Sequence, residues 1–215
     1  MGVYAVKPRF RQLLRGTAKG LANRGVTPDQ VTTAGVVASG LGAAALWLGG
    51  RRGWRGAFAA VPVLAFARTA ANALDGLVAE ESGLGRPAGE LYNETADRLG
   101  DIAFLAGTAT VPGVPPALAL GALAAAELSS FVGVGAKAAG GTRRYDGPMG
   151  KPDRMLLLGA AGLVAAGLRR PARARVLNAG LALIAVGALA TAANRYRRAH
   201  AELEARTPAP DRPGA

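Results

Sequence analysis

The sequence predicts an all-α integral membrane protein with six transmembrane helices and an N-terminal amphipathic helix in the membrane interface. Half of the 215 residues are hydrophobic and only 5% are aromatic, so Ala and Gly supply much of the apolar character. Small residues suit close helix–helix packing in membranes. Six apolar stretches recur along the chain, and Lys and Arg gather at their ends.

The net charge of +12 comes from 26 Lys and Arg residues against 14 Asp and Glu residues. A basic balance can indicate nucleic-acid binding, but these basic residues flank apolar runs, without an aromatic platform or a basic recognition helix. Their placement therefore favours membrane lipids with anionic headgroups as partners, and no nucleic acid. The chain has no Cys, which excludes disulfide bonds.

A single membrane domain is predicted over residues 1–205, and it begins with a juxtamembrane helix within 1–25. Basic and apolar residues alternate at roughly helical spacing over 3–24, which favours a helix lying in the cytoplasmic interface. An ordinary soluble amphipathic helix is the alternative. The composition of the C-terminal tail, 206–215, predicts disorder.

Proline residues set the starts of most predicted spans. The Thr27-Pro28 pair is a favourable helix start, and prolines at 112, 115 and 116 break the chain between the third and fourth spans. A loop covers 140–150. A bilayer crossing needs about 20 residues. The predicted spans are 27–49, 54–82, 87–110, 116–139, 152–168 and 171–198.

Six spans place both termini on one side of the membrane. The segments on that side hold seventeen Lys or Arg residues, whereas the loops on the other side hold seven. This bias predicts cytoplasmic termini in a multi-pass protein of the cell membrane. Trp47 and Trp54 flank the first outer loop and are typical of interface anchors. The outer basic residues are Arg51, Arg52, Arg55, Arg169, Arg170, Arg173 and Arg175.

Half of the acidic residues fall within residues 72–101. Charged groups at membrane depth are costly and usually functional. Helical spacing places two polar sets on one face each of the second and third spans. The sets are Asn72, Asp75, Gly76 and Ala79, and Gly89, Asn93, Asp97 and Asp101. Carboxylate and amide oxygens in one cavity suit Mg²⁺, Mn²⁺ or Ca²⁺. The alternative is interhelical hydrogen bonding neutralised by Arg68 and Arg98.

This stretch resembles the signature of the CDP-alcohol phosphotransferase family, D-x2-D-G-x2-A-R-x8-G-x3-D-x3-D, with every spacing kept. Gly83 matches a further glycine often seen in the family. The segments "TPDQVTTAG" and "GPMGKPDR" resemble two more family segments. The Asn residues at the first and third Asp positions of the signature resemble the pattern of a bacterial subgroup of the family. The matching positions are Asn72, Asp75, Gly76, Ala79, Glu80, Gly89, Asn93 and Asp97.

The resemblance implies an enzyme of phospholipid biosynthesis, a phosphatidyltransferase that forms a homodimer. It would move a phosphatidyl-type group from a CDP-linked lipid, such as CDP-diacylglycerol, to an alcohol acceptor and release CMP. Asp97 would be the general base. Mg²⁺ or Mn²⁺ would bind to Asn72, Asp75, Asn93 and Asp97. The CDP-lipid would lie beside Gly76, Ala79, Glu80, Gly83 and Gly89.

Two other functions stay open. Glu80 replaces the signature Arg, which favours a catalytically altered family member that binds nucleotide-lipid or metal without transfer. A small ion-coupled transporter is the other alternative. Five basic residues are candidates for binding a phosphorylated acceptor, or serve only as cytoplasmic loop charge: Lys137, Arg143, Arg144, Lys151 and Arg154. Glu127 either faces the cavity or pairs with Lys137, and His200 is expected to be solvated.

Overall fold

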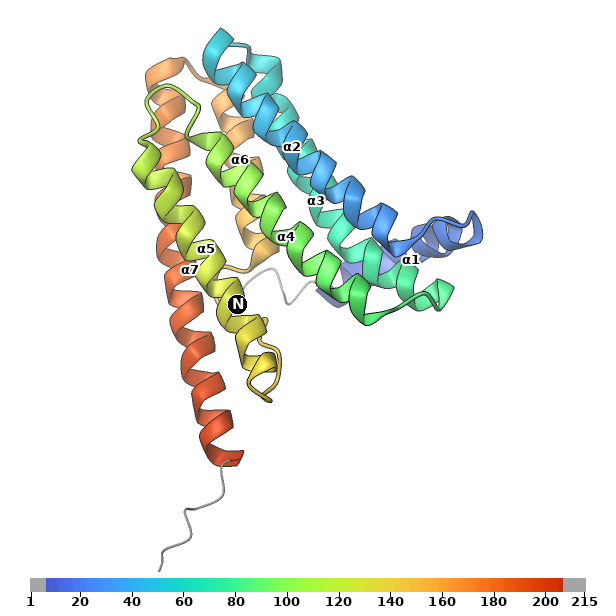
Figure 1. Cartoon of the computed structure of the whole chain (residues 1–215). Helices are drawn as coiled ribbons and strands as arrows, with labels where there is room; N and C mark the ends of the chain where they lie inside the picture. Colours follow the sequence, from blue (N-terminus) through green and yellow to red (C-terminus); the bar gives the residue numbers. More distant parts are fainter. Residues whose placement is uncertain (1–6, 207–215) are drawn as a thin grey trace, which may run out of the picture.

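The computed structural model describes residues 7–206 and is entirely helical over that range (Figure 1). The all-α prediction is therefore confirmed. Residues 3–6 of the predicted first helix and 207–215 of the predicted disordered tail lie outside the described residues. The helices are α1 (Lys7–Asn23), α2 (Pro28–Arg52), α3 (Arg55–Ser82), α4 (Pro87–Thr108), α5 (Pro116–Ala138), α6 (Lys151–Gly167) and α7 (Arg170–Arg206).

The helix starts follow the local signals in the sequence. Thr27 caps α2, because its Oγ1 accepts from the Gln30 backbone N–H at 3.3 Å while the Gln30 side chain accepts from the Thr27 N–H at 2.9 Å. The end of α7 differs from the prediction, since the helix continues to Arg206 instead of ending at residue 198. Its last turns are held by Glu202, which accepts hydrogen bonds from Thr142 in the loop before α6.

Helix α2 packs against both α3 and α4, while α3 also packs against α6 and α1, and α5 packs along α7. Figure 1 shows α4 crossing beside α2, with α5 and α7 on the other side of the bundle. The core is apolar and sits where α2, α3, α4, α6 and α7 meet. Its largest buried side chains include Leu46, Phe58, Phe104, Leu158 and Leu181.

Glycines allow the helices to approach closely at particular points. A Cβ built on Gly42 of α2 would lie 2.3 Å from the ring of Phe104 on α4. One built on Gly107 would lie 2.9 Å from the Ala43 backbone. Close approach of this kind is what small residues provide in membrane bundles.

In the described part of the chain, four helices are long and apolar enough to cross a membrane: α2, α3, α5 and α7. Helix α4 is interrupted by charged residues, and α6 has only 17 residues. The six-span count therefore stays a prediction. Helix α1 buries Ala18 against Leu77 and Val78 of α3 and leaves Leu13 79% exposed. Its location in the membrane interface stays a prediction too.

The glycine contact between α2 and α4 predicts a stability loss for Gly42→Ala. The added methyl group would collide with the buried Phe104 ring, and overpacking of this kind costs about 1–3 kcal/mol. Thermal unfolding of the purified protein in detergent would measure it. Gly121→Ala on α5 is the matched control, because a Cβ there meets no atom within 4 Å. Equal melting temperatures for the two variants would contradict the packing argument.

Candidate functional site

The polar stretch lies on the C-terminal half of α3 and the N-terminal half of α4. The two helices are joined by a short turn in which Gly83 adopts the left-handed conformation at φ +68°. Both helices pack along α2, and polar side chains bridge between them. Asn72 donates from its amide nitrogen to Asp97 Oδ1 at 2.5 Å. The structure therefore brings together Asn72 and Asp97, which lie 25 residues apart in sequence.

Asp97 is buried and surrounded by donors from two helices, α3 and α6. Besides Asn72, the Lys151 ammonium at the start of α6 donates to Asp97 Oδ2. The Arg68 guanidinium lies 3.8 Å from Oδ1 and donates to the Asp97 backbone carbonyl at 2.9 Å. Asp97 therefore lies between an amide from α3 and an ammonium from α6, with a guanidinium close by.

Asp101, one helical turn further on, is held between two arginines. Arg68 from α3 donates to its Oδ1 at 3.0 Å, and Arg154 from α6 donates to its Oδ2 at 2.5 Å. Asp101 and Arg154 are fully buried. Gly100 makes room for this arrangement, because a Cβ there would lie 2.6 Å from the Arg68 Nε. Both carboxylate oxygens of Asp101 are ion-paired, so this residue of α4 links its own helix to α3 and to α6.

Asp75 is buried and faces α2. Its Oδ2 accepts from the Thr32 hydroxyl at 3.1 Å, and its Oδ1 accepts from the Gly76 backbone N–H at 2.6 Å. A Cβ built on the adjacent Gly76 would meet no atom within 4 Å, so the helix surface is open at that position. Asn93 is half-buried and makes no hydrogen bond within the described chain. Both residues keep capacity for a further partner.

The polar side chains of this stretch are candidate ligands for one hard divalent cation. In residues 7–206, no three Asp, Glu or His side chains gather at one point, so a cation here would depend on two carboxylates and on amide oxygens. Oxygen ligands of this kind suit Mg²⁺ or Mn²⁺. The candidate ligands are Asn72, Asp75, Asn93 and Asp97. Asp101 is excluded, because each of its oxygens is ion-paired with a buried arginine, whereas the oxygens of Asp75 accept only from uncharged donors and those of Asp97 from one amide and one ammonium.

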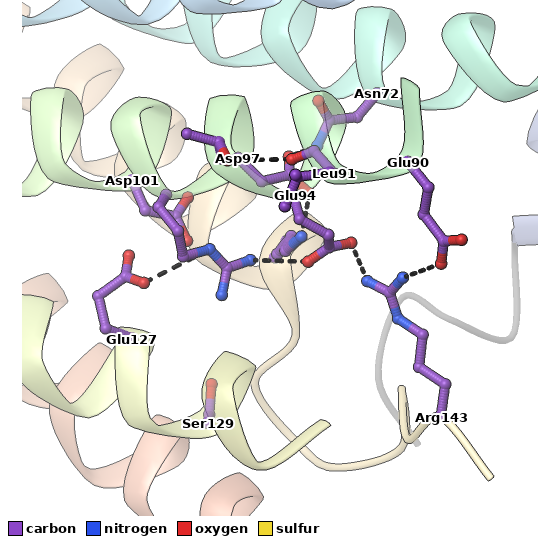
Figure 2. A network of polar contacts seen from close by, with 12 residues as sticks. Asn72, Glu90, Leu91, Glu94, Asp97, Asp101, Glu127, Ser129 and Arg143 are labelled. Atoms are coloured by element: carbon purple, nitrogen blue, oxygen red, sulfur yellow. Dashed lines mark hydrogen bonds and ion pairs between the residues drawn. The ribbon is translucent and has the colours of Figure 1, made fainter. Parts of the chain in front are cut away.

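A chain of ion pairs runs from α4 toward α5 and the loop before α6 (Figure 2). Arg143 from that loop pairs with Glu94, and it lies 3.5 Å from Glu90. Arg98 lies 3.8 Å from Glu94 and 3.4 Å from Glu127. The partner of Glu127 is thus Arg98, and the suggested pairing with Lys137 is wrong. Lys137 pairs with Glu90 at 2.6 Å.

A small, partly open hollow lies beside this network. Five cationic side chains and one carboxylate contribute to its wall, and among these cations Arg144 and Lys151 also pair with carboxylates outside it, Glu202 and Asp97. Burial raises the pKa of the Tyr145 phenol, which therefore stays protonated at neutral pH. The lining residues are Glu94, Arg98, Ser130, Gly133, Val134, Arg143, Arg144, Tyr145, Lys151 and Arg195.

Lys151 connects the hollow to the signature motif, which covers residues 72–97. Its side chain lines the hollow, and its ammonium donates to Asp97 of the motif. Arg143 and Arg144 also line the hollow, as the sequence suggested. Lys137 and Arg154 do not, since Lys137 lies on the surface beside Glu90 and Arg154 is buried against Asp101. The exposed His200 lies 3.8 Å from Glu204.

Two contributors were missed at the sequence level. Arg195 of α7 donates to the backbone carbonyls of Ser129, Tyr145 and Asp146, and it fixes the loop that carries Arg143. Thr32 of α2 holds Asp75. The rarity of charged groups within apolar helices could have singled out Arg195. Nothing in the sequence distinguishes Thr32 from Thr33.

Glu80 lies on the exposed rim of the site and has a specific partner. Arg11 from α1 donates to its Oε1 at 2.5 Å. The carboxylate that replaces the signature Arg therefore carries a guanidinium from another helix. Two other arginines that could stand in for the signature Arg, Arg68 and Arg86, have other partners, namely Asp101 and Asp29.

The chain is similar to curated membrane proteins and to solved structures. It is 36% identical to the inner membrane protein YnbA of Escherichia coli over 166 residues, covering 77% of this chain and 81% of that protein. It is 33% identical to the phosphatidylinositol phosphate synthase of Mycolicibacterium smegmatis over 165 residues, covering 74% and 69%. No protein-family model matches the chain.

The structural similarity covers nearly the whole chain. A crystal structure of Mycobacterium tuberculosis phosphatidylinositol phosphate synthase with CDP-DAG bound matches with a TM-score of 0.73 at 25% identity, covering 95% of this chain and all of that one. The same enzyme in complex with manganese and citrate matches with a TM-score of 0.72 at 26% identity, covering 93% and 92%. The fold that this chain shares with these structures therefore includes both the signature motif and the segments that line the hollow.

The buried pairing of Asp101 predicts a large stability loss for Asp101→Asn. The amide cannot neutralise Arg68 and Arg154, and breaking a buried charge network costs about 3–5 kcal/mol. Thermal unfolding in detergent would measure the loss. The control is Asp29→Asn, whose exposed pair with Arg86 contributes about 1 kcal/mol or less. A similar small shift for both variants would show that the Asp101 pairing is not structural.

Proposed function

Because this chain belongs to the CDP-alcohol phosphotransferase family, we propose that it transfers a phosphatidyl-type group from a CDP-linked lipid to an alcohol and releases CMP. The observation that carries the proposal is the junction at Lys151. This side chain touches Asp97 of the motif and also lines the positive hollow. A lipid substrate at the motif and a soluble acceptor in the hollow would thus meet at one carboxylate.

The four candidate ligands support a role for Mg²⁺ or Mn²⁺. A solved structure of a relative contains manganese. When bound, such a cation neutralises pyrophosphate oxygens and stabilises the departing CMP phosphate. Two of the four ligands, Asn72 and Asn93, carry no charge, so the set offsets one divalent ion better than two. A relative with CDP-DAG bound supports a CDP-lipid as the donor.

The charge of the hollow favours a phosphorylated acceptor. Five cations line the hollow, and several of them have carboxylate partners within the fold: Arg143 pairs with Glu94, Arg144 with Glu202 and Lys151 with Asp97. Guanidinium groups bind phosphate through paired hydrogen bonds. Arg143 is partly neutralised by Glu94 and Glu90, so the acceptor phosphate would compete with these carboxylates. The charge is concentrated around one cavity, which favours acceptor binding over scattered loop charge.

The proposed reaction begins with a proton transfer from the acceptor hydroxyl to Asp97. The acceptor oxygen then forms a bond to the lipid-side phosphorus of the CDP-lipid. The pyrophosphate P–O bond breaks, and CMP departs with the electron pair. The Lys151 ammonium donates to Asp97 Oδ2 in the free protein and would shift to the acceptor phosphate when the acceptor binds, which leaves Asp97 free to take the proton. Asn72 holds the carboxylate in place through the hydrogen bond to Oδ1.

Two alternative functions have less support than the transfer reaction. A catalytically altered member that binds nucleotide-lipid or metal is favoured only by Glu80, whose charge is compensated by Arg11. The small ion-coupled transporter has no support from the relatives. Homodimer formation and cytoplasmic termini are further parts of the proposal.

Release of CMP tests the transfer reaction. The purified full chain is incubated with CDP-diacylglycerol, Mg²⁺ or Mn²⁺, and glycerol, inositol and their phosphates. We expect CMP with a phosphorylated alcohol and none after chelation of the metal. Asp97→Asn should lower the rate by at least about 100-fold, since the general base is lost. Asp29→Asn is the control. Absence of CMP with every acceptor would favour the altered member.

The pairing of Arg11 with Glu80 predicts a coupled effect on substrate binding. Arg11→Gln leaves the Glu80 carboxylate uncompensated beside an anionic lipid, so the KM for CDP-diacylglycerol should rise about fivefold, as expected for an exposed pair. The double variant R11Q/E80Q should regain most of the affinity. Arg15→Gln, an exposed arginine on the same helix, is the control. A double variant no better than Arg11→Gln would contradict the coupling.

A further inference from the structure

The end of the bundle away from the motif has an unbalanced positive charge. Here α2 turns into α3 and α6 turns into α7, and Figure 1 shows these two connections at the same end of the bundle. No Asp or Glu occurs in the sequence between residues 30 and 74, between 102 and 126, or between 154 and 201. The connections nevertheless carry seven arginines. No carboxylate in the described chain is therefore available at this end to neutralise them.

Three of these arginines form a close cluster. Arg55 begins α3, Arg170 begins α7, and both are near enough to Arg173 to repel its charge. Arg170 reaches the α2–α3 connection, since a Cβ built on Gly53 would lie 3.7 Å from its Nη2. Like charges packed together are unfavourable unless an anion lies among them.

Arg173 already has its partners within the fold. It is buried, it donates to the carbonyl oxygens of Ala165 and Leu168 at 3.0 Å each, and its guanidinium lies 4.3 Å from the centre of the Phe58 ring. Carbonyls at the C-terminal end of α6 are suited to a cation. Arg55 and Arg170, by contrast, are exposed and make no hydrogen bond or ion pair within residues 7–206.

The position of the cluster indicates what the missing anion is. Arg55 and Asp75 lie twenty residues apart on α3, which corresponds to about 30 Å, the thickness of the hydrocarbon core of a bilayer. The exposed Trp54 precedes Arg55, and the exposed Trp47 lies under Arg51 at 5.7 Å. Trp residues mark the headgroup level of a membrane. The cluster therefore lies at headgroup depth in the leaflet opposite the motif.

We propose that Arg55 and Arg170 bind the phosphate of an anionic phospholipid in that leaflet, with Arg51, Arg52 and Arg169 around it. Anionic headgroups are the charges available at this depth, and each basic residue near them contributes about 1 kcal/mol. The first turns of α3 and α7 contain no acidic residue, so their N–H groups add to the positive potential. This lipid is distinct from the substrate of the proposed transfer.

Native mass spectrometry of the purified full chain tests this site with added phosphatidylglycerol, phosphatidylcholine or inorganic phosphate. We expect phosphatidylglycerol to be retained best, and R55Q/R170Q to weaken its binding by about tenfold or more. The control R24Q/R197Q removes the same charge from exposed positions near the other end of the bundle. The conservative variant R55K/R170K should keep most of the binding, because it keeps the charge.

Three outcomes would overturn the proposal. One is unchanged phosphatidylglycerol binding in R55Q/R170Q. Another is an equal loss of phosphatidylglycerol binding in the control R24Q/R197Q, which would show that the lipid responds only to the net charge of the protein. The third is displacement of the lipid by millimolar inorganic phosphate, which would assign the cluster to a free anion. CMP release is measured on the same variants, and neither residue touches the motif. A failure here therefore leaves the transfer reaction unaffected.

Discussion

The pairing of Asp101 with Arg68 and Arg154 determines how the polar site is held in this bundle. It joins α3, α4 and α6 at a level where α3 and α4 meet through polar side chains. A buried charge left without its partner is strongly destabilising, so the three groups specify one arrangement of the helices. Gly100 is part of the same constraint, because any side chain there would displace the Arg68 guanidinium. Asp97, one turn before Asp101, is positioned as a consequence.

The concentration of acidic residues in one stretch has two physical reasons. Glu90, Glu94 and Asp101 each pair with a basic side chain from another segment, so they hold the loop before α6 and the start of α6 against α4. Asp75 has no ion pair within the described residues and accepts only from Thr32 and the Gly76 N–H, while Asp97 pairs with Lys151. The structural charges are thus neutralised by arginines and loop residues, and the two aspartates of the signature have weaker or more readily exchanged partners.

The sequence predicts features that depend on nearby residues and misses those that depend on distant ones. The starts of α2, α4 and α5 follow from Pro28, Pro87 and Pro116, because proline at a first helical position is a local signal. The face shared by Asn72 and Asp75 follows from helical spacing. In contrast, Arg143 and Arg154 look alike in sequence, yet one lines the hollow and the other is buried. The bonds of Lys151 to Asp97 and of Arg11 to Glu80 span 54 and 69 residues, and no local pattern encodes them.

The two ends of the bundle differ in how their charge is balanced. At the motif, carboxylates and cations occur together, and five cationic side chains line the hollow. At the opposite end, arginines occur without any carboxylate, although the rule for loop charge predicts few basic residues on the outer side. A fold stabilised mainly by small apolar residues has few internal means of neutralising such a cluster. Its counter-ions must come from outside the chain, and at headgroup depth the membrane itself supplies them.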